Sequence, residues 1–265
     1  MINLPTIFFK IPAPVFHGSI LASQSFHRHT IGQLLRSILI SIGLSIIFST
    51  TQAQQIIIQF HHIANGKPLV LADSSYTNPF GEKYQITRLK YYISNIGFAP
   101  QQQSNIALID AAANDSIVIH AKAGNYQALY FTLGVDSALN CSGAQDGALD
   151  PTNGMFWTWN SGYIFFKMEG YSPASTADLQ RIEHHIGGYR FPYNAAKNVA
   201  LKFKQPLQLM PGDKKEIHVV LNLDRYWSGW NDVKIASLPL LMKPDKFSLM
   251  AAFNFIDMFH INAIQ

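Results

Sequence analysis

The fold class is decided by the segment QITRLKYYISNI, residues 85–96. β-Branched and aromatic side chains fill this segment, and such side chains fit the half-buried, pleated surface of a strand. The segment has no proline or glycine to interrupt it. It therefore predicts a β-strand, long enough to carry a bulge.

Shorter segments of the same kind recur on both sides of it. Asn65-Gly66 reads as a tight hairpin turn between two of them, and Pro211-Gly212-Asp213 reads as the turn of a later strand pair. Strands every 8–12 residues with turn signals between them indicate a β-sandwich or barrel. We therefore expect a mainly β, single-domain protein. The remaining predicted strands cover residues 56–62, 67–71, 105–110, 116–120, 126–133, 155–169, 199–209 and 215–223.

Two stretches depart from strand character. Residues 134–154 lose periodicity and are rich in Gly, Asp, Asn and Ser, which predicts a long central loop. Near the C-terminus, Leu249, Phe253, Ile256 and Phe259 recur with helical spacing. This spacing predicts a short C-terminal helix.

An export signal is expected at the N-terminus. Arg36 precedes the apolar run of residues 37–48, and Thr51-Gln52-Ala53 supplies small residues before a cleavage point. The run is shorter than the roughly 20 apolar residues that a membrane-spanning helix needs. We therefore expect residues 1–53 to be a leader, residues 54–265 to be the mature domain without a stable membrane span, and the location to be periplasmic or extracellular.

The charge of the chain argues against nucleic-acid binding. The formal net charge is +4, but three basic residues and no acidic residue lie within residues 1–53. The rest of the chain is therefore almost neutral. It has no basic stripe that would follow a phosphate backbone.

Residues 154–167 gather large aromatic side chains. On a strand, Met155, Trp157 and Trp159 would share one face. Such a face could be a core stripe, a platform for stacking a sugar or a partner surface, or an oxidisable aromatic beside a metal. The pattern alone leaves these alternatives open.

Histidine pairs occur at two places in the mature chain, His61-His62 and His184-His185. Neutral imidazole is the commonest metal-binding side chain and suits copper and zinc. Adjacent residues of a strand point to opposite faces, so one histidine of each pair would enter a given site. Surface histidines are the other interpretation, because no fixed-spacing zinc motif is present.

Enzymatic motifs are absent from the sequence. The acids of the central loop, Asp136, Asp146 and Asp150, together with Glu169, read better as turn residues than as a hydrolytic pair. No nucleophile-elbow, phosphate-loop or dinucleotide-binding pattern occurs. We therefore expect a binding protein rather than an enzyme.

Four blocks, taken in order, resemble the MbnP-like copper-binding protein family. The likeness spans about residues 55–225, and the chain departs from the family pattern in holding a single cysteine, Cys141. The blocks are Leu89–Ile96, Leu133–Asp136 with Asn140, Gly154–Tyr163 and His185–Gly188.

The resemblance implies an exported, β-rich, copper-binding protein. It further implies a dihaem, peroxidase-like partner of the MbnH type, which oxidises a tryptophan to kynurenine. By this resemblance, Trp157 or Trp159 is the candidate for oxidation and His185 is the candidate copper ligand. His61 or His62 would add a second imidazole, and Met155 a soft sulfur ligand.

Overall fold

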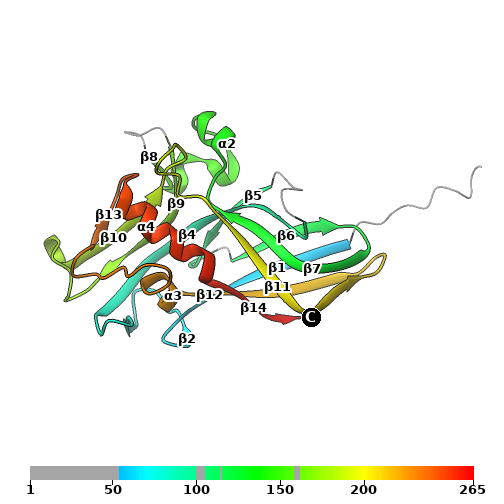
Figure 1. Cartoon of the computed structure of the whole chain (residues 1–265), viewed down its shortest axis with the longest axis horizontal. Coiled ribbons are helices and arrows are strands. Elements are labelled where there is room, and N and C mark those ends of the chain that lie inside the picture. Colours follow the sequence, from blue (N-terminus) through cyan, green and yellow to red (C-terminus); the bar gives the residue numbers. More distant parts are fainter. Residues whose placement is uncertain (1–53, 100–104, 114, 158–161) are drawn as a thin grey trace, which may run out of the picture. The chain divides into compact units, whose positions relative to one another are not determined.

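Two β-sheets form the body of the molecule (Figure 1). This computed structural model describes residues 54–99, 105–113, 115–157 and 162–265. The predicted leader, residues 1–53, and Trp159 lie outside the described residues. Within them, the mainly β prediction is confirmed.

The first sheet has five strands in the order β14-β12-β1-β2, with β6 also paired to β1. It is mixed, because β1 runs parallel to β12 and antiparallel to β2 and β6. Along β1, residues Ile56, Ile58 and Phe60 are buried and alternate with more exposed neighbours, which is the pattern of a sheet with one face on a core. The strands are β1 (Gln54–Ala64), β2 (Lys67–Pro68), β6 (Ser116–Ala121), β12 (Lys214–Asn222) and β14 (Phe259–Ile264).

The second sheet has nine strands in the order β11-β7-β4-β9-β10-β13, with β3 and β5 paired to β4 and β8 paired to β9. Its central strand β4 contains the segment that decided the fold class, and it carries irregular registers against β7 and β9, as a bulged strand does. The strands are β3 (Ser75–Thr77), β4 (Lys83–Gly97), β5 (Ile106–Asp110), β7 (Gly124–Leu133), β8 (Phe156–Trp157), β9 (Gly162–Tyr171), β10 (Arg181–Gly187), β11 (Lys197–Leu209) and β13 (Leu240–Leu241).

Aromatic side chains join the two sheets. The ring of Phe60 on β1 lies 6.1 Å from that of Tyr91 on β4 and 6.4 Å from that of Phe131 on β7, both edge to face. Such edge-to-face contacts add about 0.5–1.5 kcal/mol beyond the burial of area. The face of each sheet that carries these rings is called its inner face below, and the opposite face its outer face.

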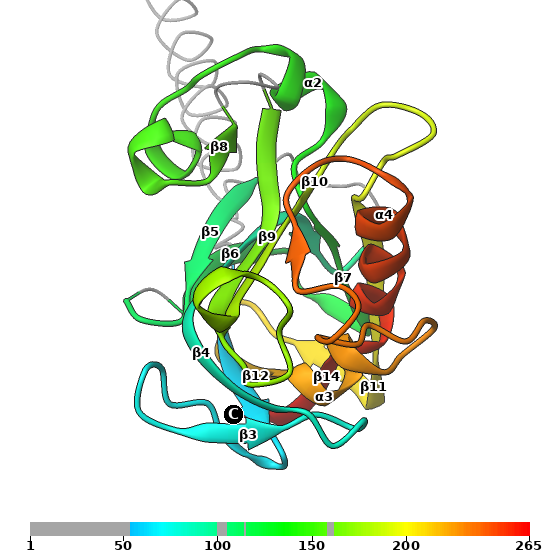
Figure 2. The same ribbon diagram turned by 90° about the vertical axis from the view of Figure 1, so that its left-hand side faces the viewer.

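Short helices occupy the connections (Figure 2). The predicted central loop contains α2 (Ser137–Cys141), η1 (Gly147–Leu149) and η2 (Pro151–Asn153), and Figure 2 shows α2 together with β8 at one end of the nine-stranded sheet. The predicted C-terminal helix is α4 (Lys246–Phe253) extended by η4 (Asn254–Asp257), but the chain then ends in β14. The others are η3 (Asp178–Gln180) and α3 (Leu223–Trp227). Among the described residues, no helix has the length and apolar character needed to cross a membrane.

The turn predictions are confirmed where the two strands on either side of the turn pair with each other. Asn65 and Gly66 both have positive φ and join β1 to β2, as the hairpin prediction requires. The predicted pairing across Pro211-Gly212-Asp213 is wrong, because β11 pairs with β7 and β12 pairs with β1 and β14. This turn carries the chain from one sheet to the other, and turn chemistry alone does not report which sheet the next strand joins.

Close packing in the centre of the larger sheet yields a stability prediction. Gly170 of β9 lies between Ile86 and Ile182, and a Cβ at this position would overlap the carbonyl oxygen of Gln85. Gly170→Ala is therefore expected to lower the free energy of unfolding by about 1–3 kcal/mol or more, because the backbone must move. The denaturant midpoint of the purified protein measures this change.

Gly124→Ala is the matched control. Gly124 also lies in a strand, but a Cβ there would be 3.6 Å from the Tyr126 ring, an ordinary contact distance. Its substitution is expected to change the free energy of unfolding by at most about 0.5 kcal/mol. Equal effects of the two substitutions would contradict the packing argument.

Candidate metal centre

His185 lies in a cluster of charged side chains on the outer face of the nine-stranded sheet. It is opposite Lys167 across β10 and β9, and its Nε2 is 2.8 Å from Oε1 of Glu169. Lys167 Nζ is 3.2 Å from the same oxygen, and Arg88 bonds the other oxygen. Residues from β4, β9 and β10 therefore meet at one carboxylate.

The charges around Glu169 keep it ionised. Burial works against the charge, but the hydrogen bond with His185 and the nearby Lys167 and Arg88 outweigh it and lower the pKa of Glu169 to about 2. An ionised carboxylate only accepts hydrogen bonds, so Nε2 of His185 must carry the hydrogen. When that imidazole is neutral, its Nδ1 has the lone pair. Metal-binding histidines commonly have such a carboxylate partner, which fixes the tautomer and the ring orientation.

Trp157 and Met155 approach the same stretch of β10 from the β8 hairpin. The carbonyl of Met155 accepts the amide hydrogen of Ile164 at 2.8 Å, and Trp157 pairs with Gly162. A Cβ on Gly187 would lie 2.9 Å from Cζ3 of Trp157, so the six-membered part of the indole covers this glycine. Gly187 is two residues after His185, and only a residue without a side chain leaves room for the ring.

A lysine links this hairpin to the charged cluster. Lys167 Nζ donates to the carbonyl of Gly154 at 3.0 Å, one residue before Met155. The cation that faces Glu169 thus also holds the start of the aromatic segment. The backbone of Met155 and the indole of Trp157 thus lie along the ends of β9 and β10, where Gly187 follows His185 by two residues.

The N-terminal histidines do not join this group, contrary to the expectation of a second imidazole from β1. His62 points to the inner face, where its Nε2 is 3.0 Å from the Tyr91 hydroxyl. Tyr91 pairs with Phe166, which pairs with Ile186, so His185 lies on the opposite face of the same sheet. His61 follows Phe60 and points to the outer face of the five-stranded sheet, where it is exposed.

Sequence reasoning missed the role of His184. Its ring is fully buried, with Nδ1 2.6 Å from the Tyr226 hydroxyl and Nε2 2.8 Å from the carbonyl of Leu238. Burial lowers its pKa to about 4, so the ring is neutral at ordinary pH. It ties β10 to α3 and to the segment before β13. In the sequence, the adjacent aromatic residues Tyr226 and Trp227 were the available sign of this role. Both are buried, and a buried tyrosine hydroxyl needs a hydrogen-bond partner such as His184.

The acids of the central loop have structural partners. Asp136 caps α2 by accepting from the amide of Leu139, and Asp150 accepts from the amide and the hydroxyl of Thr152. These contacts agree with the interpretation of Asp136 and Asp150 as turn residues. The same interpretation is wrong for Glu169, which lies within β9 and forms an ion pair with Lys167 on the same face of that strand. Asn140, in the same loop, accepts the amide hydrogen of Tyr163 and so fixes the start of β9, while Cys141 is exposed.

The donor set near His185 decides what the centre could bind. No group of three or more His, Cys, Asp or Glu side chains with metal-binding geometry occurs in the described part of the chain. A thioether and an indole are not among those side-chain types. The contacts above establish the His185 imidazole as a donor here, with the indole of Trp157 over Gly187 on the same strand.

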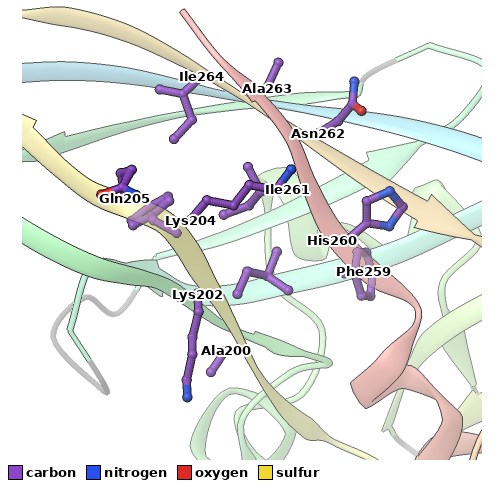
Figure 3. Close-up of a pocket in the computed structure, with 12 residues that line it drawn as sticks. Ala200, Lys202, Lys204, Gln205, Phe259, His260, Ile261, Asn262, Ala263 and Ile264 are labelled. Atoms are coloured by element: carbon purple, nitrogen blue, oxygen red, sulfur yellow. The ribbon is translucent and has the colours of Figure 1, made fainter.

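A groove elsewhere in the molecule is separate from these residues. It has a volume of about 600 Å³ and lies between β11 and β14, which are edge strands of the two sheets. Figure 3 shows Lys202, Lys204 and Gln205 on β11, with His260 and Asn262 on β14. No residue of the His185 cluster lines it.

Comparisons with known proteins give one consistent result. A family model described as MbnP matches residues 53–243. Among solved structures, MbnP from Methylosinus trichosporium is similar, with a TM-score of 0.50 and 16% sequence identity over 70% of this chain and 80% of that chain. At this identity the structural likeness concerns the fold. A search of curated protein sequences gave no significant match.

Two histidines with lowered pKa values, His62 and His184, predict how stability depends on pH. Burial lowers the pKa of both His62 and His184 from the ordinary 6.5 to about 4. Between these two pH values the unfolded chain binds protons that the folded chain does not. The contribution of these histidines to the free energy of unfolding is therefore fully present above pH 6.5 and is lost as the pH falls toward 4. Each histidine contributes up to about 3 kcal/mol of this loss.

Denaturant unfolding at a series of pH values tests this dependence. His62→Gln is expected to remove about half of the decrease between pH 6.5 and 4. Glu169 does not interfere, because its pKa is lowered from 4.5 to about 2 and its contribution is lost only below pH 4.5. An unchanged slope in the variant would show that His62 is not responsible.

Proposed function

The chain belongs to the MbnP family, and from this premise we propose that it is an exported copper-binding protein. We further propose that Trp157, or Trp159 outside the described residues, is oxidised to kynurenine by a dihaem partner of the MbnH type. The domain then acts as a binding protein, with the oxidation carried out by the partner.

One observation carries the proposal. The indole of Trp157 covers Gly187, two residues beyond His185, whose ring is oriented by Glu169. An imidazole from β10 and an oxidisable aromatic group from β8 thus come to the same end of the sheet, although 28 positions separate them in sequence.

Copper chemistry suits this donor set. Cu(I) and Cu(II) accept imidazole nitrogen, and Cu(I) also accepts soft sulfur such as the Met155 thioether. A single imidazole and a thioether are too few for a tight site, so a further ligand is needed. Oxidation of Trp157 would provide one, because opening the five-membered ring leaves an aromatic amine on the remaining ring. The net change replaces one indole carbon by an oxygen: cleavage of the C2–C3 bond takes up two oxygen atoms from peroxide that reacts at the haem partner, and hydrolysis then releases C2 as formate.

The location follows from the proposed leader. Residues 1–53 have a basic residue, an apolar run and small residues before residue 54, which are the parts of an export signal. A periplasmic or cell-surface location would place the protein where an exported haem protein also works.

The alternative of an aromatic binding platform has less support. A platform that stacks a sugar needs an exposed ring, whereas the side chain of Trp157 is 5% exposed. Phe156, its neighbour, packs edge to face on Tyr163. The described part of this aromatic segment is therefore largely packed against protein rather than open to a ligand.

Copper binding and protein mass test the proposal together. The protein is co-produced with its haem partner, and copper content and intact mass are then measured. The wild type is expected to retain copper and to show the exchange of one carbon for one oxygen at a single tryptophan. Relative to the wild type, His185→Ala should lose one bound copper ion per chain, and Glu169→Gln should lower copper affinity at this centre about 10–100-fold by releasing the imidazole.

Trp157→Phe and Trp230→Phe form a matched pair. Trp230 is 65% exposed and lies outside the aromatic segment, so its substitution should change neither mass shift nor copper content. Trp157→Phe should abolish the mass shift if Trp157 is the oxidised residue, and peptide mapping would otherwise place the shift on Trp159. Equal copper retention by wild type and His185→Ala would refute the proposal.

A further inference from the structure

Two histidines meet on the outer face of the five-stranded sheet, away from the centre described above. Nε2 of His61 on β1 lies 2.9 Å from Nδ1 of His218 on β12, and the two ring planes are within 20° of parallel, with centroids 5.1 Å apart. Residues 61 and 218 are far apart in sequence, and the parallel pairing of β1 with β12 brings them together.

The register of the strands explains why His61 and His218 are in contact. His61 is opposite Val220, and His218 is two residues before Val220 on the same strand, so all three point to the outer face. His260 on β14 is also opposite Val220, from the other side. Val220 is only 6% exposed although it lies on an outer face, which agrees with its position between two imidazole-bearing residues.

We propose that His61 and His218 form a chelating site for a divalent transition-metal ion. In the described structure the two nitrogens share one hydrogen, since a nitrogen–nitrogen contact of 2.9 Å needs one donor and one acceptor. A metal ion would replace that hydrogen and bind both lone pairs. The ion would lie off the line that joins the nitrogens, so both rings must turn to aim their lone pairs at it. The exposed ring of His61 has room to do so, and that of His218 is partly exposed.

A chelate that keeps this separation of the nitrogens would favour one class of metal. With metal–nitrogen bonds of about 2.0–2.1 Å, neighbouring ligands at right angles are about 2.8–3.0 Å apart, whereas tetrahedral ligands are about 3.3–3.4 Å apart. The observed 2.9 Å fits the right-angle arrangement. Square-planar and tetragonal nitrogen coordination is typical of Cu(II) and Ni(II).

The carboxylate of Glu216 lies near the ring nitrogen of His218 that does not face His61. Nε2 of His218 is buried without a hydrogen-bond partner, and its nearest acid is Oε1 of Glu216 at 3.7 Å. That distance is too long for a hydrogen bond but short enough for an electrostatic contact. When Nδ1 binds a metal, Nε2 must carry the hydrogen, and a small movement would let it donate to Glu216. Carboxylate partners of this kind orient metal-binding histidines.

This site is independent of the proposed copper centre. His61 projects from the outer face of the five-stranded sheet, and His185 from the outer face of the other sheet. The two sites therefore share no residue, and one could be lost without the other.

Titration with CuCl₂ and NiCl₂ tests the inference in the purified protein carrying His185→Ala, which removes the other site. Isothermal calorimetry gives affinity and stoichiometry, and electron paramagnetic resonance counts the nitrogens bound to Cu(II). One ion per chain is expected, with two imidazole nitrogens. His61→Gln and His218→Gln should each weaken binding roughly a hundredfold, because each removes one arm of the chelate.

His120→Gln is the control. His120 is exposed on the same sheet face, opposite Gln55, which is about 20 Å along β1 from His61. Its substitution should leave affinity unchanged, and thermal unfolding should show that all variants are folded. The inference is overturned if no ion binds, if Cu(II) shows fewer than two nitrogens, or if His61→Gln and His218→Gln bind as tightly as the parent.

Discussion

The alternation of side chains across β10 is the constraint on which the rest of the site depends. His184 and His185 are neighbours in sequence, yet one is buried against Tyr226 and the other faces Glu169. The first imidazole holds the sheet to α3, and the second is oriented as a ligand would be. Because one strand supplies both, the residues that stabilise β10 also fix the direction in which His185 points.

The parts of the fold that depend on local sequence could be predicted, and those that depend on distant contacts could not. Segments such as Gln85–Ile96 carry their structure in local composition, and the Asn65-Gly66 turn needs no distant information. Partners of β11 and β12 could not be predicted, because pairing across sheets depends on which buried faces meet in the core. The contact of Phe60 with Tyr91 and Phe131 sets those faces, and it joins residues far apart in sequence.

For the candidate site, the types of residues were predictable and their grouping was only partly so. Trp157 reaches the strand that holds His185 through the β8–β9–β10 order and through the space that Gly187 leaves for an indole. The expected contribution of His61 and His62 fails for a geometric reason, since Tyr91 and its pairing partners lie between His62 and His185. Neither Glu169 nor Lys167 was expected to orient the site, because a sequence shows no ion pair across strands.

Charge around His185 limits which donors could complete a copper site there. Lys167 lies within 3.2 Å of Glu169 and binds Gly154, so a fixed cation already occupies the approach from the charged side. A second cation next to it is disfavoured by like-charge repulsion, which is strongest where water is excluded. Neutral ligands such as a thioether or an aromatic amine would avoid bringing further charge into this cluster. A centre that relies on neutral donors also favours Cu(I), the softer and less charged form of the ion. In such a centre the carboxylate of Glu169 would act through the imidazole rather than on the metal, because its hydrogen bond orients His185.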